Sequence, residues 1–304
     1  MNDTNQFKQA GKYACILFDK TFKVTVCKQE NEELLRGIIE LLIPGKRIAS
    51  LQMNRNEQEG DSVSEKTVIF DIVCTDADSG EKFIVEMQFG EQHSYRDRML
   101  CYATYPIREQ LAKKLSERRK LVALDRMDYT LNPVYVISLL NFALEHESPE
   151  ALEDNGLISR YSIRNEGNNE PMTGALHFVY LELERLKYGE NEPERCKTLL
   201  EQFAFSLKYI HTLSNRPKGF DDPLMDRLFR ATELATMTIV ERESYEKAMR
   251  TELDIIAEKQ FARDKGREEG RAEATRVIAE RMRQAGFSAS DISKATGLPE
   301  KETD

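Results

Sequence analysis

The sequence predicts an α/β (α+β) fold, in which helices flank a mixed β-sheet and a helical C-terminal region with a long charged helix follows. Two apolar runs, VIFDIVC and EKFIVEMQF, flank the turn-rich segment TDADSG and predict a β-hairpin over residues 68–88. The segment NPVYVISLLNF (132–142) is rich in β-branched residues, which favours a buried strand. From residue 239 to about 285 the chain is dense in Glu, Lys, Arg and Ala, which is typical of a long solvated helix.

The 304 residues are enough for a large buried core and more than one domain. We expect a first domain over residues 1–190, a helical extension over 191–238, and the long charged helix with a helix-turn-helix-like tail over 239–304. In that tail Ser288 is a plausible helix N-cap and Ile292 has core-like spacing.

The remaining elements follow from local patterns. Asn31 is a candidate N-cap for a helix over 32–42, and the polar stretch 51–66 predicts an exposed loop. A helix is expected over 94–115, where Pro106 should kink or split it. We expect two further strands at 157–165 and 176–183, and helices from residue 194 and over 222–237, whereas the pattern near residues 13–26 fits a strand or a short helix.

Charge and composition exclude several classes of function. The net charge of −9 argues against a general polyanion binder, yet residues 96–126 carry nine Lys or Arg against four acids. Such a stretch can guide a phosphate backbone, or it can be a solvated helix face. The four histidines lack metal-ligand spacing and no phosphate-binding loop is present. The absence of tryptophan, a common sugar platform, argues against a glycosidase.

The cysteines and hydropathy bear on compartment. The five cysteines are scattered without CxxC spacing, which suits reduced thiols. No apolar run approaches the roughly 20 residues of a membrane span, and the N-terminal residues lack the apolar core of a signal peptide. We therefore expect a cytoplasmic protein without a membrane partner.

Three polar residues interrupt the apolar hairpin. Glu86 and Gln88 point to the same face of their strand because side chains alternate, and a turn centred between residues 78 and 79 places Asp71 opposite Glu86. Burying two unpaired carboxylates costs several kcal/mol each, so they need a cation or a shared proton. A hard divalent metal held by carboxylate and backbone oxygens meets that need, which makes the hairpin the candidate active site.

Five segments in this order resemble the recombination-promoting nuclease / transposase (Rpn) family of the PD-(D/E)XK nuclease superfamily. They are FDKTFK, NEELLRGIIELL, FDIVCTDADSGEKFIVEMQ, RDRMLCYATYPIREQL and DYTLNPVYVISLLNF, within about residues 13–265. The resemblance implies a restriction-endonuclease-like core in which carboxylates at the ends of two strands bind magnesium. This sequence has Phe70 where the superfamily name has proline, and Gln88 where it has lysine.

The resemblance also assigns roles to residues. It implies that Asp71 and Glu86 are metal ligands together with the backbone carbonyl of Met87, and that Glu33 holds an accessory acidic position near the metal. A further set matches the R…Y…Q pattern of the helix behind the site: Arg98, Tyr102 and Gln110. From the residues alone, Glu33 could equally be favourable charge at a helix start, and Arg98 and Tyr102 could be packing or surface residues.

The expected activity is Mg²⁺-dependent hydrolysis of DNA phosphodiester bonds by an endonuclease, with Mn²⁺ as a substitute metal. Gln88 is expected to position the attacking water, and Arg98, Tyr102, Lys113 and Lys114 to contact nucleic acid. Cleavage of RNA would use the same residues. The competing hypothesis is a non-catalytic DNA-binding or assembly module that keeps the nuclease fold and forms homo-oligomers through the C-terminal helix.

Overall fold

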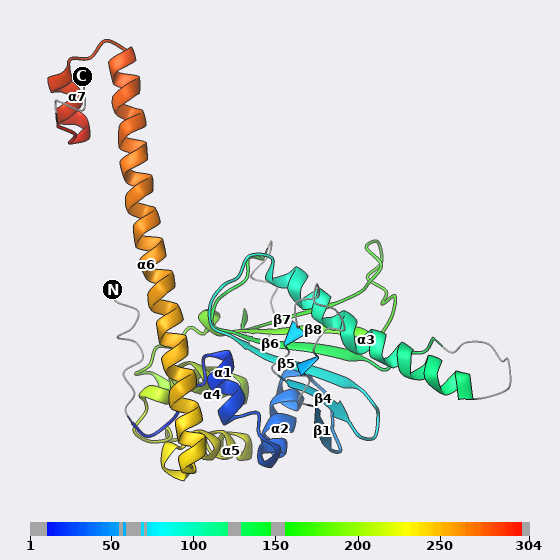
Figure 1. The fold of residues 1–304 in the computed structure, drawn as a ribbon. Helices are drawn as coiled ribbons and strands as arrows, with labels where there is room; N and C mark the ends of the chain where they lie inside the picture. Colours follow the sequence, from blue (N-terminus) through cyan, green and yellow to red (C-terminus); the bar gives the residue numbers. More distant parts are fainter. Residues whose placement is uncertain are drawn as a thin grey trace. The chain divides into compact units, whose positions relative to one another are not determined.

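The computed structural model describes residues 11–54, 57–58, 68–69, 72–120, 129–146 and 156–299. The chain separates into two compact units, Met1–Met249 and Arg250–Asp304. The first unit contains the sheet and most of the helices, and the helices predicted within residues 191–238 belong to it (Figure 1).

A six-stranded mixed sheet forms the centre of the first unit, with strand order β1-β4-β5-β6-β8-β7. The central pairs β5·β6 and β6·β8 are parallel, whereas β1·β4, β4·β5 and β8·β7 are antiparallel. The strands are β1 (Leu51–Asn54), β4 (Ile72–Asp76), β5 (Lys82–Gln88), β6 (Val134–Leu140), β7 (Ile158–Ser162) and β8 (Leu176–Glu182). A separate two-stranded pair consists of β2 (Glu57–Gln58) and β3 (Val68–Ile69). The mixed sheet with flanking helices confirms the predicted fold class.

The predicted hairpin is confirmed in its register from Ile72 onward, whereas Val68 and Ile69, expected in its first strand, pair with β2. Ile72 is paired with Val85 and Val73 with Ile84, as a turn centred between residues 78 and 79 requires. The Asp76 side chain closes this turn by accepting from the Ser79 hydroxyl at 2.7 Å. Gly80 adopts φ +69°, which other residues rarely accept, and its N–H donates to the Asp76 carbonyl at 2.9 Å.

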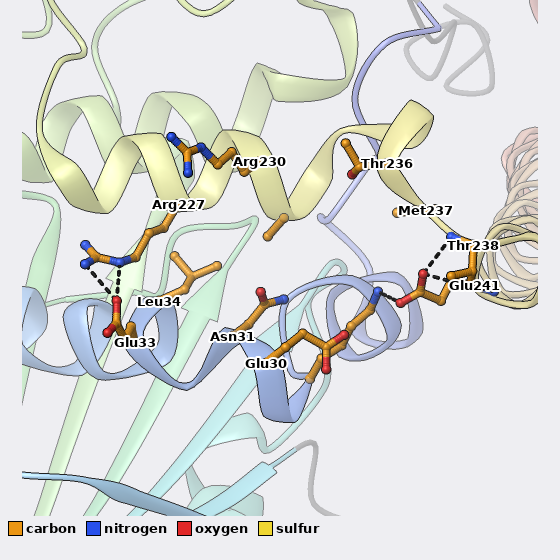
Figure 2. Close-up of a pocket in the computed structure, with 12 residues that line it drawn as sticks. Glu30, Asn31, Glu33, Leu34, Arg227, Arg230, Thr236, Met237, Thr238 and Glu241 are labelled. Carbon is orange, nitrogen blue, oxygen red and sulfur yellow. Dashed lines mark hydrogen bonds and ion pairs between the residues drawn. The ribbon is translucent and has the colours of Figure 1, made fainter.

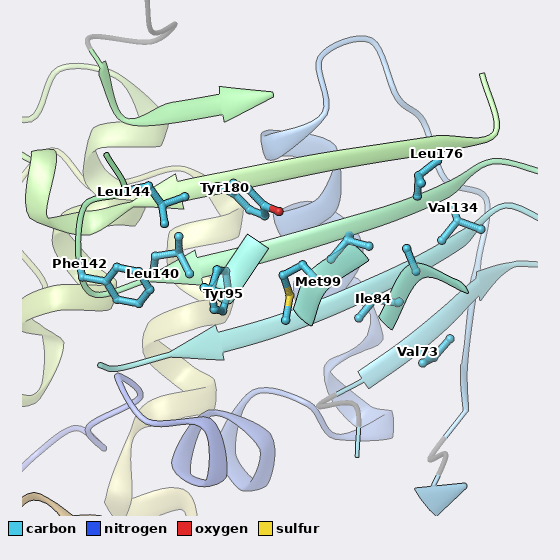
Figure 3. Close-up of a cluster of buried hydrophobic side chains, with 12 residues drawn as sticks. Val73, Ile84, Tyr95, Met99, Val134, Leu140, Phe142, Leu144, Leu176 and Tyr180 are labelled. Atoms are coloured by element: carbon cyan, nitrogen blue, oxygen red, sulfur yellow. The ribbon is translucent and has the colours of Figure 1, made fainter. Parts of the chain in front are cut away.

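One face of the sheet packs against the long helix α3 (Tyr95–Lys120) (Figures 1 and 3). Tyr95, Met99 and Ala103 lie on one side of this helix and are buried against the sheet. Their sheet partners include Val73, Ile84, Val134, Val136, Leu140, Leu176 and Tyr180. The helix continues through Pro106, so the predicted split does not occur. Burial of the face before the proline, extended by the partly buried Ile107 after it, stabilises the helix despite the missing backbone N–H.

The other face of the sheet is covered by short helices (Figure 1). Helix α1 (Asp19–Thr25) contacts β5, and α2 (Glu32–Leu42) contacts β1. Helices α4 (Leu199–Tyr209) and α5 (Pro223–Thr232) pack in turn against α2. Asn31 precedes α2 as predicted, but its side chain does not cap the helix and donates to the Thr25 carbonyl at 3.0 Å.

The prediction of a loop over residues 51–66 is wrong at its start and also at residues 57–58, which form β2. Leu51 to Asn54 form the edge strand β1, whose pairing with β4 supplies the backbone hydrogen bonds that the polar sequence did not reveal. The Glu32 carboxylate fixes the entry to this strand by accepting from the Leu51 N–H at 2.8 Å.

Helix α6 (Ile239–Gln284) spans 46 residues, as the charge pattern predicted. In the second unit it is followed by α7 (Ala289–Thr296), which Ser288 caps by accepting from the Asp291 N–H at 3.2 Å. Ile292 is buried there, and Gly297 ends α7 in the left-handed conformation with φ +76°. Among the described residues, no helix is long and apolar enough to cross a membrane.

Candidate active site

The candidate site lies at the carboxyl end of β5, where polar residues replace apolar ones on the face toward α3. Ile84, Glu86 and Gln88 alternate with Phe83, Val85 and Met87, as a strand requires. Glu86 is only 7% exposed although it is an acid. A carboxylate buried beside aliphatic side chains needs a compensating charge or hydrogen bonds.

Arg98, from the first turn of α3, supplies that charge. Its Nη2 donates to Glu86 Oε1 at 2.8 Å and to Gln88 Oε1 at 2.7 Å. Its Nη1 donates to Gln92 Oε1, and the guanidinium carbon lies 5.1 Å from the Tyr95 ring centre and 5.6 Å from that of Tyr102. The structure therefore brings together Glu86, Gln88, Arg98 and Tyr102, four of the residues singled out in the sequence.

Asp19 is the acidic residue that the sequence analysis missed. It begins α1 and lies close enough to Glu86 for its negative charge to raise the Glu86 pKa. The neighbouring Phe18 contacts Phe89, just beyond β5, with ring centres 4.5 Å apart. The available signal was an acid that interrupts the apolar run YACILF and is followed by the helix-compatible segment KTFK.

The environment of Glu86 favours its protonated form. Burial raises its pKa, the Arg98 guanidinium partly opposes this effect, and the Asp19 charge raises the pKa further, to about 7. This direction indicates that Arg98 compensates only part of the cost of burying the carboxylate. A buried group with so perturbed a pKa beside a charged partner is a candidate functional residue.

Two buried oxygen atoms here are suited to a cation. Glu86 Oε2 and Asp19 Oδ1 are both inaccessible to solvent and have no hydrogen-bond partner among the described residues. Carboxylate oxygens are the ligands that hard divalent cations prefer. Within the described ranges no group of three or more His, Cys, Asp or Glu residues is arranged to hold a metal. Asp71, the predicted ligand that directly precedes Ile72, lies outside the described residues.

The other predicted ligand positions differ in their surroundings. Met87 is fully buried, and strand alternation turns its side chain to the face opposite Glu86. Glu33 is 62% exposed and its Oε2 lies 2.8 Å from Nη2 of Arg227 on α5. The structure thus gives Glu33 a cationic partner, and it is Asp19 that lies near Glu86.

Glu33 instead lines a separate groove between α2, α5 and the start of α6, with a volume of about 540 Å³ (Figure 2). Its charged side chains are largely engaged with one another: Arg227 binds Glu33, and Lys28 binds Glu241. The Lys28 ammonium and the Thr238 backbone and hydroxyl lower the Glu241 pKa to about 2. These pairings explain Glu33 and Glu241 as structural charges.

The other residues of α3 that the sequence singled out make different contacts. Gln110 exchanges two hydrogen bonds with the Asn132 backbone, at 2.8 and 3.1 Å, and so holds the segment before β6. Lys114 donates to the Thr130 carbonyl at 2.5 Å, whereas Lys113 is exposed. Of these residues, Lys113 is the one whose side chain faces solvent.

Comparison with protein families supports the nuclease family that the fold and the hairpin suggest. Searches of curated proteins and of solved structures found no significant match. The family model described as "PD-(D/E)XK nuclease family transposase" matches residues 16–262, from just before α1 into α6. Because this match covers most of the chain and includes every element around Glu86, the protein belongs to the PD-(D/E)XK nuclease family transposases.

Proposed function

We propose that this protein is a divalent-metal-dependent endonuclease that hydrolyses phosphodiester bonds of DNA. The observation that carries the proposal is the Glu86 carboxylate, buried at the end of β5 with one oxygen atom left without a partner among the described residues. Family membership supports a nuclease, and an oxygen-only set of side chains suits Mg²⁺ or Mn²⁺.

The residues that would hold the cation are Glu86 and Asp71, with Asp19 in the accessory position that the sequence suggested for Glu33. The Met87 backbone carbonyl completes the proposed set. A cation bound there supplies Lewis acidity, which lowers the pKa of water and offsets charge on the phosphate. Glu86 must lose its proton to act as a ligand, so its raised pKa makes activity depend on pH near neutrality.

The proposed substrate is recognised by charge on α3. The exposed Arg96 and Lys113 lie on the same helix as Arg98, and both suit contacts to phosphates that position the duplex without reading its sequence. Residues 96–126 carry nine Lys or Arg against four acids, so this part of a chain with a net charge of −9 favours a polyanion.

Helix α6 supports a proposal of self-association. Residues 261–274 are all exposed, including Phe261 at 72%. Packing supplies most of the stability of helices in proteins, and a second copy of the chain would supply it here. Mass measurement by light scattering, with Phe261→Glu as the disrupting variant, tests this proposal. A wild-type mass equal to one chain contradicts it.

The thiols fit a reducing compartment. All five cysteines are free, and burial raises the pKa of Cys15 and Cys74 to about 12, which keeps both protonated and unreactive. We propose that the protein acts in the cytoplasm.

Incubation of the full chain with supercoiled plasmid tests the enzymatic proposal. Nicked or linear product is expected with Mg²⁺ or Mn²⁺ but not with EDTA, and Asp71→Ala and Glu86→Ala should each abolish it. Glu170→Gln, an exposed loop acid, serves as the matched control that retains cleavage. Single-stranded RNA in parallel separates the two nucleic acids. Cleavage that persists in both active-site variants would show that another site, or a contaminant, is responsible.

A further inference from the structure

Arg98 and Gln88 contact each other beside the buried Glu86 carboxylate. A single guanidinium nitrogen of Arg98 bridges Glu86 Oε1 and Gln88 Oε1, at 2.8 and 2.7 Å. These three side chains therefore form one hydrogen-bonded group that links the end of β5 to the first turn of α3.

The amide of Gln88 is oriented from both ends. Its Nε2 donates to the Gly90 carbonyl at 3.1 Å, so its oxygen is the atom that faces Arg98. An amide oxygen accepts from a guanidinium and carries no charge. A lysine at this position would instead place a second cation against Arg98, and the two would repel each other.

The guanidinium is held at a fixed place. It packs over the rings of Tyr95 and Tyr102, and the pKa of the buried Tyr95 hydroxyl is raised well above its ordinary value, so that ring stays neutral. Nη1 is bound by Gln92, an exposed side chain on the loop before α3 that a phosphate oxygen can displace. Arginine provides five donors in a rigid planar group, which suits simultaneous contact with a carboxylate and a phosphate.

We infer that Arg98 provides the positive charge beside the reacting phosphate, and that Gln88 is a positioning residue which holds Arg98 against Glu86. This inference rests on the proposed nuclease function and names a different role for Gln88 from the water-positioning role expected from the sequence. The charge comes from the helix, while the strand provides a neutral acceptor.

A double-mutant cycle with Arg98→Gln, Gln88→Lys and the combined variant tests the inference, because the combined variant moves the charge from α3 to β5. Each protein is measured three ways in alkaline buffer, where Glu86 is ionised: Mn²⁺ affinity by calorimetry, melting temperature in EDTA, and plasmid cleavage. Arg216→Gln, which removes an exposed arginine that binds Asp226, is the matched control.

Arg98→Gln should lower cleavage about 100-fold, as expected for loss of a group that stabilises developing charge. The same variant should bind Mn²⁺ about tenfold more tightly, because a competing positive charge is gone. Gln88→Lys should weaken Mn²⁺ binding and lower the melting temperature, since two cations then share one pocket. The combined variant should return Mn²⁺ affinity to near the wild-type value and cleave at least about tenfold faster than Arg98→Gln.

Opposite changes in Mn²⁺ affinity and cleavage distinguish a positioned charge from general damage to the fold. Additive effects of the two substitutions on the melting temperature or on cleavage, or weaker Mn²⁺ binding in Arg98→Gln, would overturn the inference. Mn²⁺ binding and melting need no cleavage, so they decide the Arg98–Gln88 coupling even if the wild-type protein fails to cut any nucleic acid. That failure would reject the proposed function only.

Discussion

Glu86 and Glu182 are two buried glutamates on one face of one sheet, and their environments are opposite. Gln88, two residues beyond Glu86, aligns across β6 with Glu182 at the end of β8. Both carboxylates are withdrawn from solvent, at 7% and 0% exposure. Yet the pKa of Glu86 is raised to about 7, whereas that of Glu182 is lowered.

The number of donors explains the difference. Glu182 accepts from the Leu144 N–H, the Ser159 hydroxyl, the His146 ring and Arg185 Nε, each at 2.8 Å. Burial raises its pKa, but these hydrogen bonds together outweigh burial and favour the ionised form. Glu86 has Arg98 on one oxygen, and its other oxygen has no partner among the described residues.

A buried carboxylate whose oxygen atoms both accept hydrogen bonds stabilises the fold. A buried carboxylate with an unpartnered oxygen atom is available for a ligand. Glu182 joins the segment after β6 to β7 and to the turn after β8, so it fixes the edge of the sheet. Among the described residues, no donor completes the hydrogen bonding of Glu86 Oε2. Substitution of Glu86 should therefore mainly affect activity, and substitution of Glu182 should mainly affect stability.

Glu86→Gln should produce the largest functional change. We expect cleavage to fall by roughly three orders of magnitude, comparable to loss of a major electrostatic group at a reaction centre. The free energy of unfolding in EDTA should stay the same or rise, because a partly compensated buried charge beside Asp19 is removed. Urea denaturation beside plasmid cleavage measures both. If Glu86→Gln were destabilised and still cleaved DNA at a measurable rate, Glu86 would have a structural role.

Glu182→Gln should produce the largest loss of stability. An amide cannot accept from four donors, so buried N–H and O–H groups and Arg185 are left unpaired. We expect a cost of about 3–5 kcal/mol in the free energy of unfolding, as for a buried ion pair that loses one partner. Ser159→Ala, which removes one neutral donor, should cost only about 1 kcal/mol. Equal effects of the two substitutions would contradict the saturated network.

The pH dependence of stability should separate the same two groups. The folded protein holds the Glu86 proton more tightly than the unfolded chain does, so stability falls as pH rises from about 4.5 to about 7. The shift corresponds to about 3 kcal/mol. Glu182 has the opposite sign: its contribution is present above its unfolded pKa and is lost as pH falls below about 4.5.

Urea denaturation in EDTA across this pH range measures both slopes. Glu86→Gln should abolish the decline in stability between about pH 4.5 and pH 7. It should leave the loss of stability below about pH 4.5 unchanged. A decline that survives in Glu86→Gln would mean that another buried group is responsible for it.

The position of Glu86, but not that of Glu182, was accessible from the sequence. The turn TDADSG fixes the hairpin register, and the two-residue period places Glu86 and Gln88 on one face. The run of β-branched residues identifies β6, and the charge pattern identifies α6. These features are local, because each depends on residues close together in the chain.

What the sequence did not predict depends on tertiary contacts. Asp19 and Glu33 are both acids at helix starts, and only the packing of α1 on β5 and of α2 on α5 distinguishes them. Likewise Leu51–Asn54 becomes a strand only because β4 pairs with it. The hydrogen bonds of Glu182 come from four donors in three separate segments, which no pattern along the chain indicates.

Substitution of Glu33 should have the smallest effect on stability and activity, and it serves as a control for Glu86 and Glu182. Its side chain is 62% exposed and pairs with Arg227, which is itself 42% exposed. Exposed ion pairs contribute about 0–1 kcal/mol, so Glu33→Gln should change the free energy of unfolding by no more than that. Because Asp19 takes the accessory acidic position in the proposed metal site, cleavage and Mn²⁺ affinity should remain at wild-type values. Asp19→Asn, measured in parallel, should weaken Mn²⁺ binding. If Glu33→Gln instead weakened Mn²⁺ binding and Asp19→Asn did not, the original assignment of Glu33 to the metal site would be correct.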